Sequence, residues 1–227
     1  ERHGGLWFAE PLLDTIDRAD WPALFDRDRG RIEIYDLFPG GVQVPPGRNV
    51  VQPSFFHGLP VAIADAAVVF GERSVYYVTP VFAVLSVVAI WLLARAVSSL
   101  TAANIAAGLL AINFAQIWFG RMPTSEMLAQ YLLLTGLYFA VVSARTPTVT
   151  SGAASGAAFG LAACTRIEVL FLVVPIVAVY LVLTRSGRRT SPAWMPMAAV
   201  FVALVLQAVG HAYWRAEPYT TRILQFA

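Results

Sequence analysis

Six apolar runs, most of them close to 20 residues long, follow one another through the sequence after residue 74. A hydrocarbon core of about 30 Å needs roughly 20 apolar residues in a helix, so each run is a candidate membrane span. Only 13% of the residues are charged and 58% are hydrophobic, which is unusual for a soluble domain. We predict an all-α, polytopic transmembrane helix bundle of about six spans, at residues 75–97, 102–119, 127–144, 148–165, 167–184 and 193–214.

The composition argues against a nucleic-acid-binding protein and against a fold held together by disulfides or a cysteine-bound metal. The formal charge of +2 is too small to indicate a nucleic-acid partner, so we expect no nucleic acid to bind. The one cysteine, Cys164, excludes an intramolecular disulfide framework and any cysteine-based metal cluster. The sequence predicts no cofactor and leaves a requirement for a divalent metal open.

The fourth run, residues 148–165, has the weakest signal because its core is short and only weakly apolar. Within it, Gly152, Gly156 and Gly160 recur every four residues on one helix face. Small residues at this spacing let two membrane helices approach closely. We predict that this face packs against a neighbouring span.

The first 58 residues are polar and irregular, and nine of the 14 acidic residues lie within the first 36. Prolines and glycines in "LFPGGVQVPPGRNVVQP" break regular structure, so we predict a loop domain outside the bilayer. Within it "LWFAEPLLDTI" has helical apolar spacing and predicts a short helix in the interface plane, and "LPVAIADAAVVFG" predicts a second. The predicted organisation is a loop domain at 1–74, the transmembrane bundle at 75–214 and the start of another loop at 215–227.

The chain opens on Glu, and no signal-like stretch follows. We expect it to begin inside a longer protein, as a fragment that lacks the first span and a C-terminal part.

The charges predict an orientation for the bundle. With six spans, all 14 acidic residues fall on the side that holds the N-terminal loop, and the opposite side carries basic residues alone, namely Arg95, Arg145, Arg185, Arg188 and Arg189. Short loops rich in Arg face the cytoplasm. We therefore predict a multi-pass protein of the plasma (inner) membrane with its N-terminal loop outside the cytoplasm.

Two pairs of opposite charges lie at the predicted outer ends of spans: Arg121 with Glu126, and Arg166 with Glu168. A guanidinium can grip a phosphate through two parallel hydrogen bonds, and a carboxylate can orient it or hold a hydroxyl. A structural interpretation has about equal weight, because Glu126 suits the first turn of a helix that begins near Ser125 and Arg121 can reach headgroups. Arg166 and Glu168 are two residues apart, so they indicate a break between spans.

Four consecutive segments carry a resemblance to a known family: "PSFFHGLPVAIADAAVVFG", "VYYVTPVFAVLSVVAIWLLARAV", "AINFAQIWFGRMPTSEMLAQYLLLTGLYF" and "GAAFGLAACTRIEVLFLVVP". In order and spacing they resemble the GT-C membrane glycosyltransferases of the protein-mannosyltransferase-like branch, over roughly residues 50–185. That family has an Arg and a nearby Glu after its third span and a Thr-Arg or Thr-Lys pattern that closes a glycine-rich span.

The resemblance implies a catalytic acid in the outer loop that follows the family's first span. Glu1 is a possible remnant of its Asp-Glu pattern, and Glu10, Asp14 and Asp17 are alternatives that a solvated helix face explains more simply. His57, in "FFHG", lies where the loop returns to the membrane and could touch a sugar or phosphate. A local hydrogen-bonding role is the commoner explanation for a lone His.

The implied activity is transfer of a sugar from a polyprenyl-phosphate donor to a glycan, lipid or protein acceptor of the cell envelope, with inversion at the sugar. Glu1 or Glu126 would act as the catalytic carboxylate. Arg121, Arg166, Glu168 and His57 would bind substrate, and an Arg would stabilise the departing phosphate. The alternatives are a transporter or flippase whose boundary charges line a substrate path, and a scaffold whose loop binds a partner.

Overall fold

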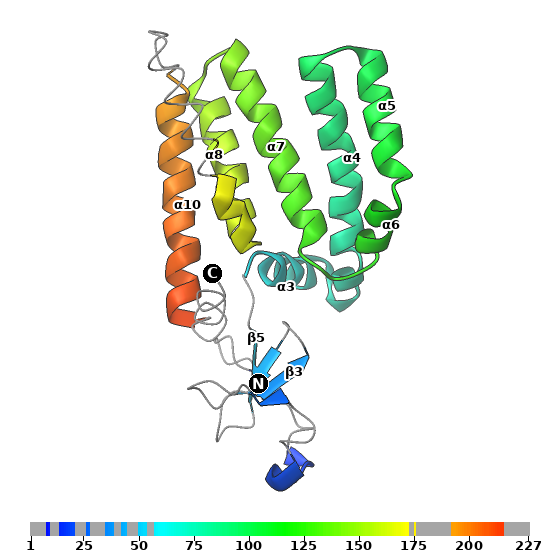
Figure 1. The fold of residues 1–227 in the computed structure, drawn as a ribbon, viewed down its shortest axis with the longest axis vertical. Helices are drawn as coiled ribbons and strands as arrows, with labels where there is room; N and C mark the ends of the chain where they lie inside the picture. The colour runs from blue at the N-terminus through cyan, green and yellow to red at the C-terminus, as the bar shows by residue number, and fades with distance from the viewer. Residues whose placement is uncertain are drawn as a thin grey trace. The chain divides into compact units, whose positions relative to one another are not determined.

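The structure is a computed structural model that describes residues 8–9, 14–20, 26–27, 35–38, 42–44, 50–53, 57–172, 175 and 192–215. The chain divides into two compact units, residues 1–56 with 209–227 and residues 57–208. The second unit contains α3 (Gly58–Phe70) and the helices that follow it, up to most of α10 (Trp194–Arg215). Figure 1 draws the longer helices of this unit side by side, with α3 across their lower ends.

The first unit contains a small antiparallel sheet, which the all-α prediction lacked. Its strand order is β1-β5-β4-β3-β2, and the strands are β1 (Phe8–Ala9), β2 (Asp26–Arg27), β3 (Tyr35–Phe38), β4 (Val42–Val44) and β5 (Val50–Pro53). The helix predicted in "LWFAEPLLDTI" is wrong at Phe8 and Ala9, which pair with Val51 and Val50. Valines and aromatic residues favour the extended backbone, and these runs are too short to show alternation clearly.

Helix α3 (Gly58–Phe70) confirms the helix predicted from "LPVAIADAAVVFG". Gly71 ends it with φ of 87°, a left-handed conformation that glycine adopts without strain. A short 3₁₀ helix, η2 (Glu72–Tyr76), then leads into the bundle. The position of α3 in the membrane interface stays a prediction.

Three of the predicted spans are long continuous helices: α4 (Val78–Val97), α7 (Glu126–Arg145) and α10 (Trp194–Arg215). Each is long and apolar enough to cross a membrane. Only 11% of the apolar window of α4 is buried, and Val81, Val84 and Val88 are exposed. A helix that exposes aliphatic side chains in this way is suited to lipid, so the chain is an integral membrane protein with several spans.

The predicted span at 102–119 is a broken helix. α5 (Leu100–Ala111) and α6 (Phe114–Gly120) meet at an angle of 58°. At the break, the side chain of Asn113 accepts a hydrogen bond from the backbone N–H of Gln116 at 3.2 Å and caps α6. The amide of Gln116 donates to the carbonyl of Ala83 in α4 at 2.9 Å, which anchors the second piece.

The structure supports fewer spans than the six predicted. Helix α8 (Val149–Ala163) is apolar but has only 15 residues, and the 3₁₀ helix η3 (Ile167–Leu172) follows it. In the described part of the chain there are three candidate spans, or four if α5 and α6 count as one. Apart from η3 and residue 175, the predicted span at 167–184 lies outside the described residues.

The glycine face of α8 packs against α10, as the spacing predicted. A Cβ atom added to Gly152 or Gly156 would collide with the backbone carbonyl of Ala193 or Met197, and one on Gly160 would lie 2.6 Å from Cβ of Leu204. On the α7 side, the buried hydroxyl of Ser155 donates to the carbonyl of Gly136 at 2.9 Å. Small residues therefore hold α8 between two neighbours.

Candidate functional site

Helix α8 ends at a polar turn that carries the Thr-Arg pair. The hydroxyl of Thr165 donates to the carbonyl of Ala162 at 2.6 Å, and the backbone N–H of Arg166 donates to the same carbonyl at 3.2 Å. These bonds satisfy the free carbonyl at the helix end and stop the helix there. Arg166 therefore lies at a break between α8 and η3, as the sequence predicted.

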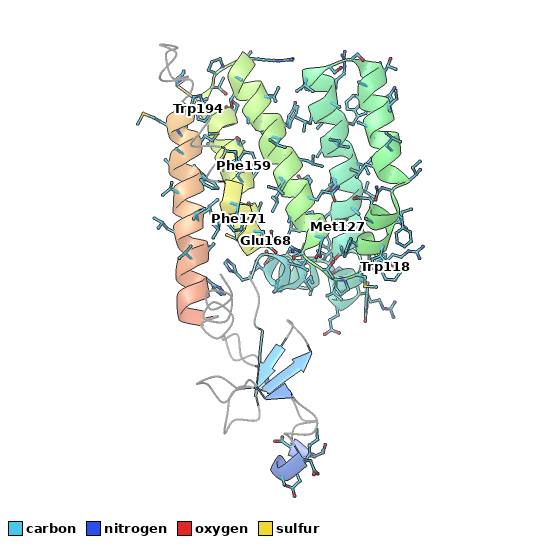
Figure 2. The ribbon with its side chains drawn as sticks, in the orientation of Figure 1. Trp118, Met127, Phe159, Glu168, Phe171 and Trp194 are labelled. Carbon is cyan, nitrogen blue, oxygen red and sulfur yellow. The ribbon has the colours of Figure 1, made fainter. Side chains whose placement is uncertain are left out.

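Helix α7 begins opposite this turn. Ser125 is the residue before its first turn, and Glu126 is the first helical residue, where a carboxylate suits the positive end of the helix dipole. The hydroxyl of Ser125 makes no capping hydrogen bond. Figure 2 labels Met127 and Glu168 at the same end of the bundle, near α3.

Arg166 binds two carboxylates, that of Glu126, which is 40 residues earlier in the sequence, and that of Glu168, which is two residues later. Its Nη1 donates to Oε1 of Glu126 at 2.6 Å, while Nε and Nη2 donate to the two oxygens of Glu168 at 3.3 and 3.0 Å. The side chains of Arg166 and Glu126 are each 33% exposed, and that of Glu168 is 58% exposed. One guanidinium faces two carboxylates, so the cluster of Glu126, Arg166 and Glu168 has an excess negative charge.

The cluster keeps Glu168 ionised. Burial is the largest single effect and raises its pKa, but the hydrogen bond from Arg166, the backbone N–H of Glu168 and the charge of Arg166 together lower the pKa below its ordinary value. The hydrogen bond from Arg166 to Glu168 is the main reason that the pKa of Arg166 is raised. The ionised forms therefore persist at neutral pH.

Two polar atoms at the start of α7 are buried, Oε2 of Glu126 and the hydroxyl of Thr124, and the side chain of Thr124 is a hydrogen-bonding neighbour of the Glu126 carboxylate. The other carboxylate oxygen of Glu126 is held by Arg166. Buried polar atoms normally have partners, because an unsatisfied one costs free energy. Thr124 and Arg166 therefore both help to hold the carboxylate of Glu126 at the start of α7.

Arg121 stays apart from this cluster. It follows α6, its side chain is exposed, and in the described residues no ion pair forms between it and a carboxylate. Glu126, Arg166 and Glu168 therefore come together. Arg121 lies between α6 and α7, and no described carboxylate compensates its charge.

The other sequence candidates have different positions. Glu1 and Glu10 lie outside the described residues. Asp14 and Asp17 belong to the first unit and are exposed, and Oδ1 of Asp17 accepts a local hydrogen bond from the backbone of Ala19 at 3.0 Å.

His57 directly precedes α3, and its Nε2 lies 3.2 Å from Nε2 of Gln207 in α10. Burial lowers the pKa of His57.

A cavity of about 380 Å³ lies beside α3. Most of its walls are apolar, and its polar lining residues are His57, Asp65, Cys164, Thr165 and Gln207. A second, still more apolar cavity of about 490 Å³ shares Ala62, Asp65 and Phe82 with the first. Apolar cavities with a few polar groups are typical of sites for small molecules and lipids.

The sequence analysis missed Asp65 and Gln207. Asp65 is the one charge within α3, and Gln207 is a polar residue in the apolar helix α10, so each interrupts an apolar run. A polar residue inside an apolar helix is a recognisable signal in a membrane protein. Counting charges at the ends of spans does not detect it.

A family model described as dolichyl-phosphate-mannose-protein mannosyltransferase matches residues 59–214, which is more than half of the chain. The matched region contains the cluster of Glu126, Arg166 and Glu168 and, apart from His57 and Gly58, the residues that line both cavities beside α3. No curated protein and no solved structure matches the chain.

Proposed function

Because the chain belongs to the dolichyl-phosphate-mannose-protein mannosyltransferase family, we propose that it transfers a sugar from a polyprenyl-phosphate donor to an acceptor on the extracytoplasmic face of the membrane. The family implies a membrane glycosyltransferase and a polyprenyl-phosphate sugar donor. The proposal adds the side of the membrane, inversion at the sugar and the residues involved. The observation that supports it best is the ion cluster at the start of α7, together with an exposed Arg121 that forms no ion pair with any described carboxylate.

Arg121 is the residue that we assign to the donor phosphate. Its charge is not offset by a carboxylate in the described part of the chain, and a guanidinium offers a planar pair of donors to phosphate oxygens. Arg166 is less suited, because two carboxylates already neutralise it and their excess negative charge repels a phosphate.

We assign Arg166 to positioning Glu126. Arg166 holds Oε1 of Glu126, and the carboxylate, whose side chain is 33% exposed, is the group that we assign to the acceptor hydroxyl. In the reaction the hydroxyl oxygen bonds to the anomeric carbon, the bond from that carbon to the phosphate oxygen breaks, and the electron pair leaves with the phosphate. The hydroxyl proton passes to a carboxylate, for which Glu126 and Glu1 are the two candidates.

Transfer of radiolabelled sugar from a polyprenyl-phosphate donor, measured with purified protein in detergent, tests this function. Losing a charge-assisted hydrogen bond costs about 1.5 to 3 kcal/mol, so Arg121→Ala should slow transfer by roughly 10- to 150-fold. Arg121→Lys keeps the charge without the planar fork and should lose less.

Arg73, an exposed arginine in η2, offers the matched control: Arg73→Ala should transfer at the parental rate. A folded Arg121→Ala protein that is as active as its parent at all donor concentrations contradicts the assignment. Movement of the intact donor across a vesicle membrane without any transferred product would favour the flippase alternative.

The orientation has its own test in intact cells. A cysteine placed at Ser54 should react with a membrane-impermeant reagent, and one placed at Ser186 should not, because the Arg-only loops are predicted to face the cytoplasm. The native Cys164 is buried, and Cys164→Ala removes its background. The reverse labelling pattern shows that the predicted orientation is wrong.

A further inference from the structure

The glycine face of α8 ends in a polar contact with α10. Cys164 follows Gly160 by four residues, so it continues the series on the same side of the helix. Its buried Sγ lies 3.4 Å from Oε1 of Gln207 and 3.8 Å from the carbonyl of Leu204. A thiol is a donor and an amide oxygen can only accept, so the thiol donates to Gln207.

This contact orients the other end of the amide. With Oε1 facing the thiol, the NH₂ group of Gln207 faces His57, and the two Nε2 atoms are 3.2 Å apart. An amide NH₂ can only donate, so Nε2 of His57 must be the acceptor and carry no proton. A neutral imidazole of this kind has its proton on Nδ1.

A backbone bond fixes His57 to the same end of α8. The N–H of Gly58 donates to the carbonyl of Cys164 at 2.9 Å. A Cβ atom on Gly58 would lie 2.5 Å from Cγ2 of Thr165, so glycine permits this close approach. His57, Cys164 and Gln207 therefore come from three segments that meet at one point of the second unit.

These three residues lie at the edge of the cavity of about 380 Å³. Its other described lining residues include one carboxylate, Asp65, and no arginine. A negative charge and a neutral imidazole disfavour a phosphate there, whereas the apolar walls and the polar edge suit an uncharged ring with hydroxyl groups.

We propose that Gln207 is a positioning residue, which holds His57 as the neutral tautomer with its proton on Nδ1, at the edge of a cavity that binds the donor's sugar. The identity of the ligand rests on the proposed function, but the control of the tautomer does not. Cys164 takes part by fixing which way the amide of Gln207 faces.

Nuclear magnetic resonance of protein labelled with ¹⁵N and ¹³C at histidine tests the tautomer without any activity assay. The chain has three histidines, and subtracting the spectrum of His57→Asn assigns the signals of His57. At about pH 8, well above the ordinary pKa of His, the parent should show a protonated Nδ1 and a bare Nε2. Gln207→Glu places an acceptor opposite Nε2 and should move the proton there.

Variants of Cys164 provide a second test of the His57 tautomer. Cys164→Ala removes the donor that orients the amide, so both tautomers should be populated, and Cys164→Ser should restore the single one. The control is Gln116→Glu, which disturbs a hydrogen bond to Ala83 elsewhere in the bundle and should leave the His57 signals unchanged. A parent protein with its proton on Nε2, or a spectrum that Gln207→Glu does not alter, overturns the role of Gln207.

Transfer kinetics then test the ligand. In Gln207→Glu the KM for the donor should rise by about 3- to 10-fold, the factor expected for one neutral hydrogen bond, with a smaller change in kcat. If the tautomer changes and the KM for the donor does not, the assignment of the sugar to this edge is wrong. If the parent transfers no sugar at all, the proposed function fails, and the spectra still decide the role of Gln207.

Discussion

Two contacts of α8 differ in what holds them together. Along its length α8 meets α10 through glycines and without charges: Gly152 and Gly156 face backbone atoms, and Gly160 faces the side chain of Leu204. Just beyond its end, Arg166 meets α7 through one short ion pair with Glu126. The glycine contact depends on how closely two helices approach, whereas the ionic contact depends on one side chain. We infer that the first contact governs the stability of the bundle and the second governs its chemistry.

The largest effect should come from adding bulk at the glycine contact. Gly156→Leu forces the backbone of α10 away at Met197 and should lower the free energy of unfolding by about 3 kcal/mol, at the upper end of the cost of overpacking. Insertion should be unaffected. Thermal unfolding of the purified protein in detergent measures the change.

A matched pair of alanine variants makes the test sharper. Gly156→Ala should destabilise, whereas Gly108→Ala in α5 has open space around it and should stabilise by up to about 1 kcal/mol, since glycine is a poor helix former. Equal effects at the two positions would show that the face with Gly156 meets lipid and not α10.

The ionic contact should show a smaller effect on stability. The coupling between Arg166 and Glu126, measured by a double-mutant cycle, should be about 1 kcal/mol or less, because solvent screens a pair that is one-third exposed. The coupling of Arg166 with the more exposed Glu168 should be weaker still. Sugar transfer should nevertheless fall in Arg166→Ala, since Glu126 loses its orientation. If Arg166→Ala loses as much stability as Gly156→Leu and still transfers sugar at the parental rate, the ionic contact governs stability and not chemistry.

The smallest effect concerns His57 beside the same end of α8. Because burial lowers the pKa of His57 in the folded state, the unfolded chain binds the proton more readily. The protein should therefore lose a little stability as the pH falls through about 6.5, the ordinary pKa of His, and none above it. Unfolding temperatures at about pH 8 and pH 5.5 should differ less in His57→Asn than in the parent. An unchanged difference would exclude His57 as its source.

The sequence was sufficient where the physical signal is local. Continuous apolar runs predicted α4, α7 and α10, and the spacing of Gly152, Gly156 and Gly160 predicted a close helix contact. The break at Asn113 was missed because it lies within an apolar run, and the strands of the first unit were missed because they have two to four residues each.

The candidate site depends on contacts that local patterns do not encode. The sequence located two charge pairs at the outer ends of predicted spans, but it did not show that Arg166 pairs with Glu126, 40 residues away, while Arg121 remains exposed. The contact of Gln207 with His57 joins residues 150 apart. Such pairings follow from how α8 packs against its neighbours, and no spacing within one helix reveals them.

The buried thiol of Cys164 also reports on the local separation of α8 from α10. It is the one cysteine in the sequence and is 3% exposed, so a thiol reagent too bulky for the cavity reaches it when the end of α8 separates from α10 or the unit unfolds. When closing is fast compared with alkylation, the labelling rate gives the free energy of that opening. Measured in bilayers of different thickness, the labelling rate would show how the lipid alters the stability of the contact between α8 and α10, and no reporter residue has to be introduced.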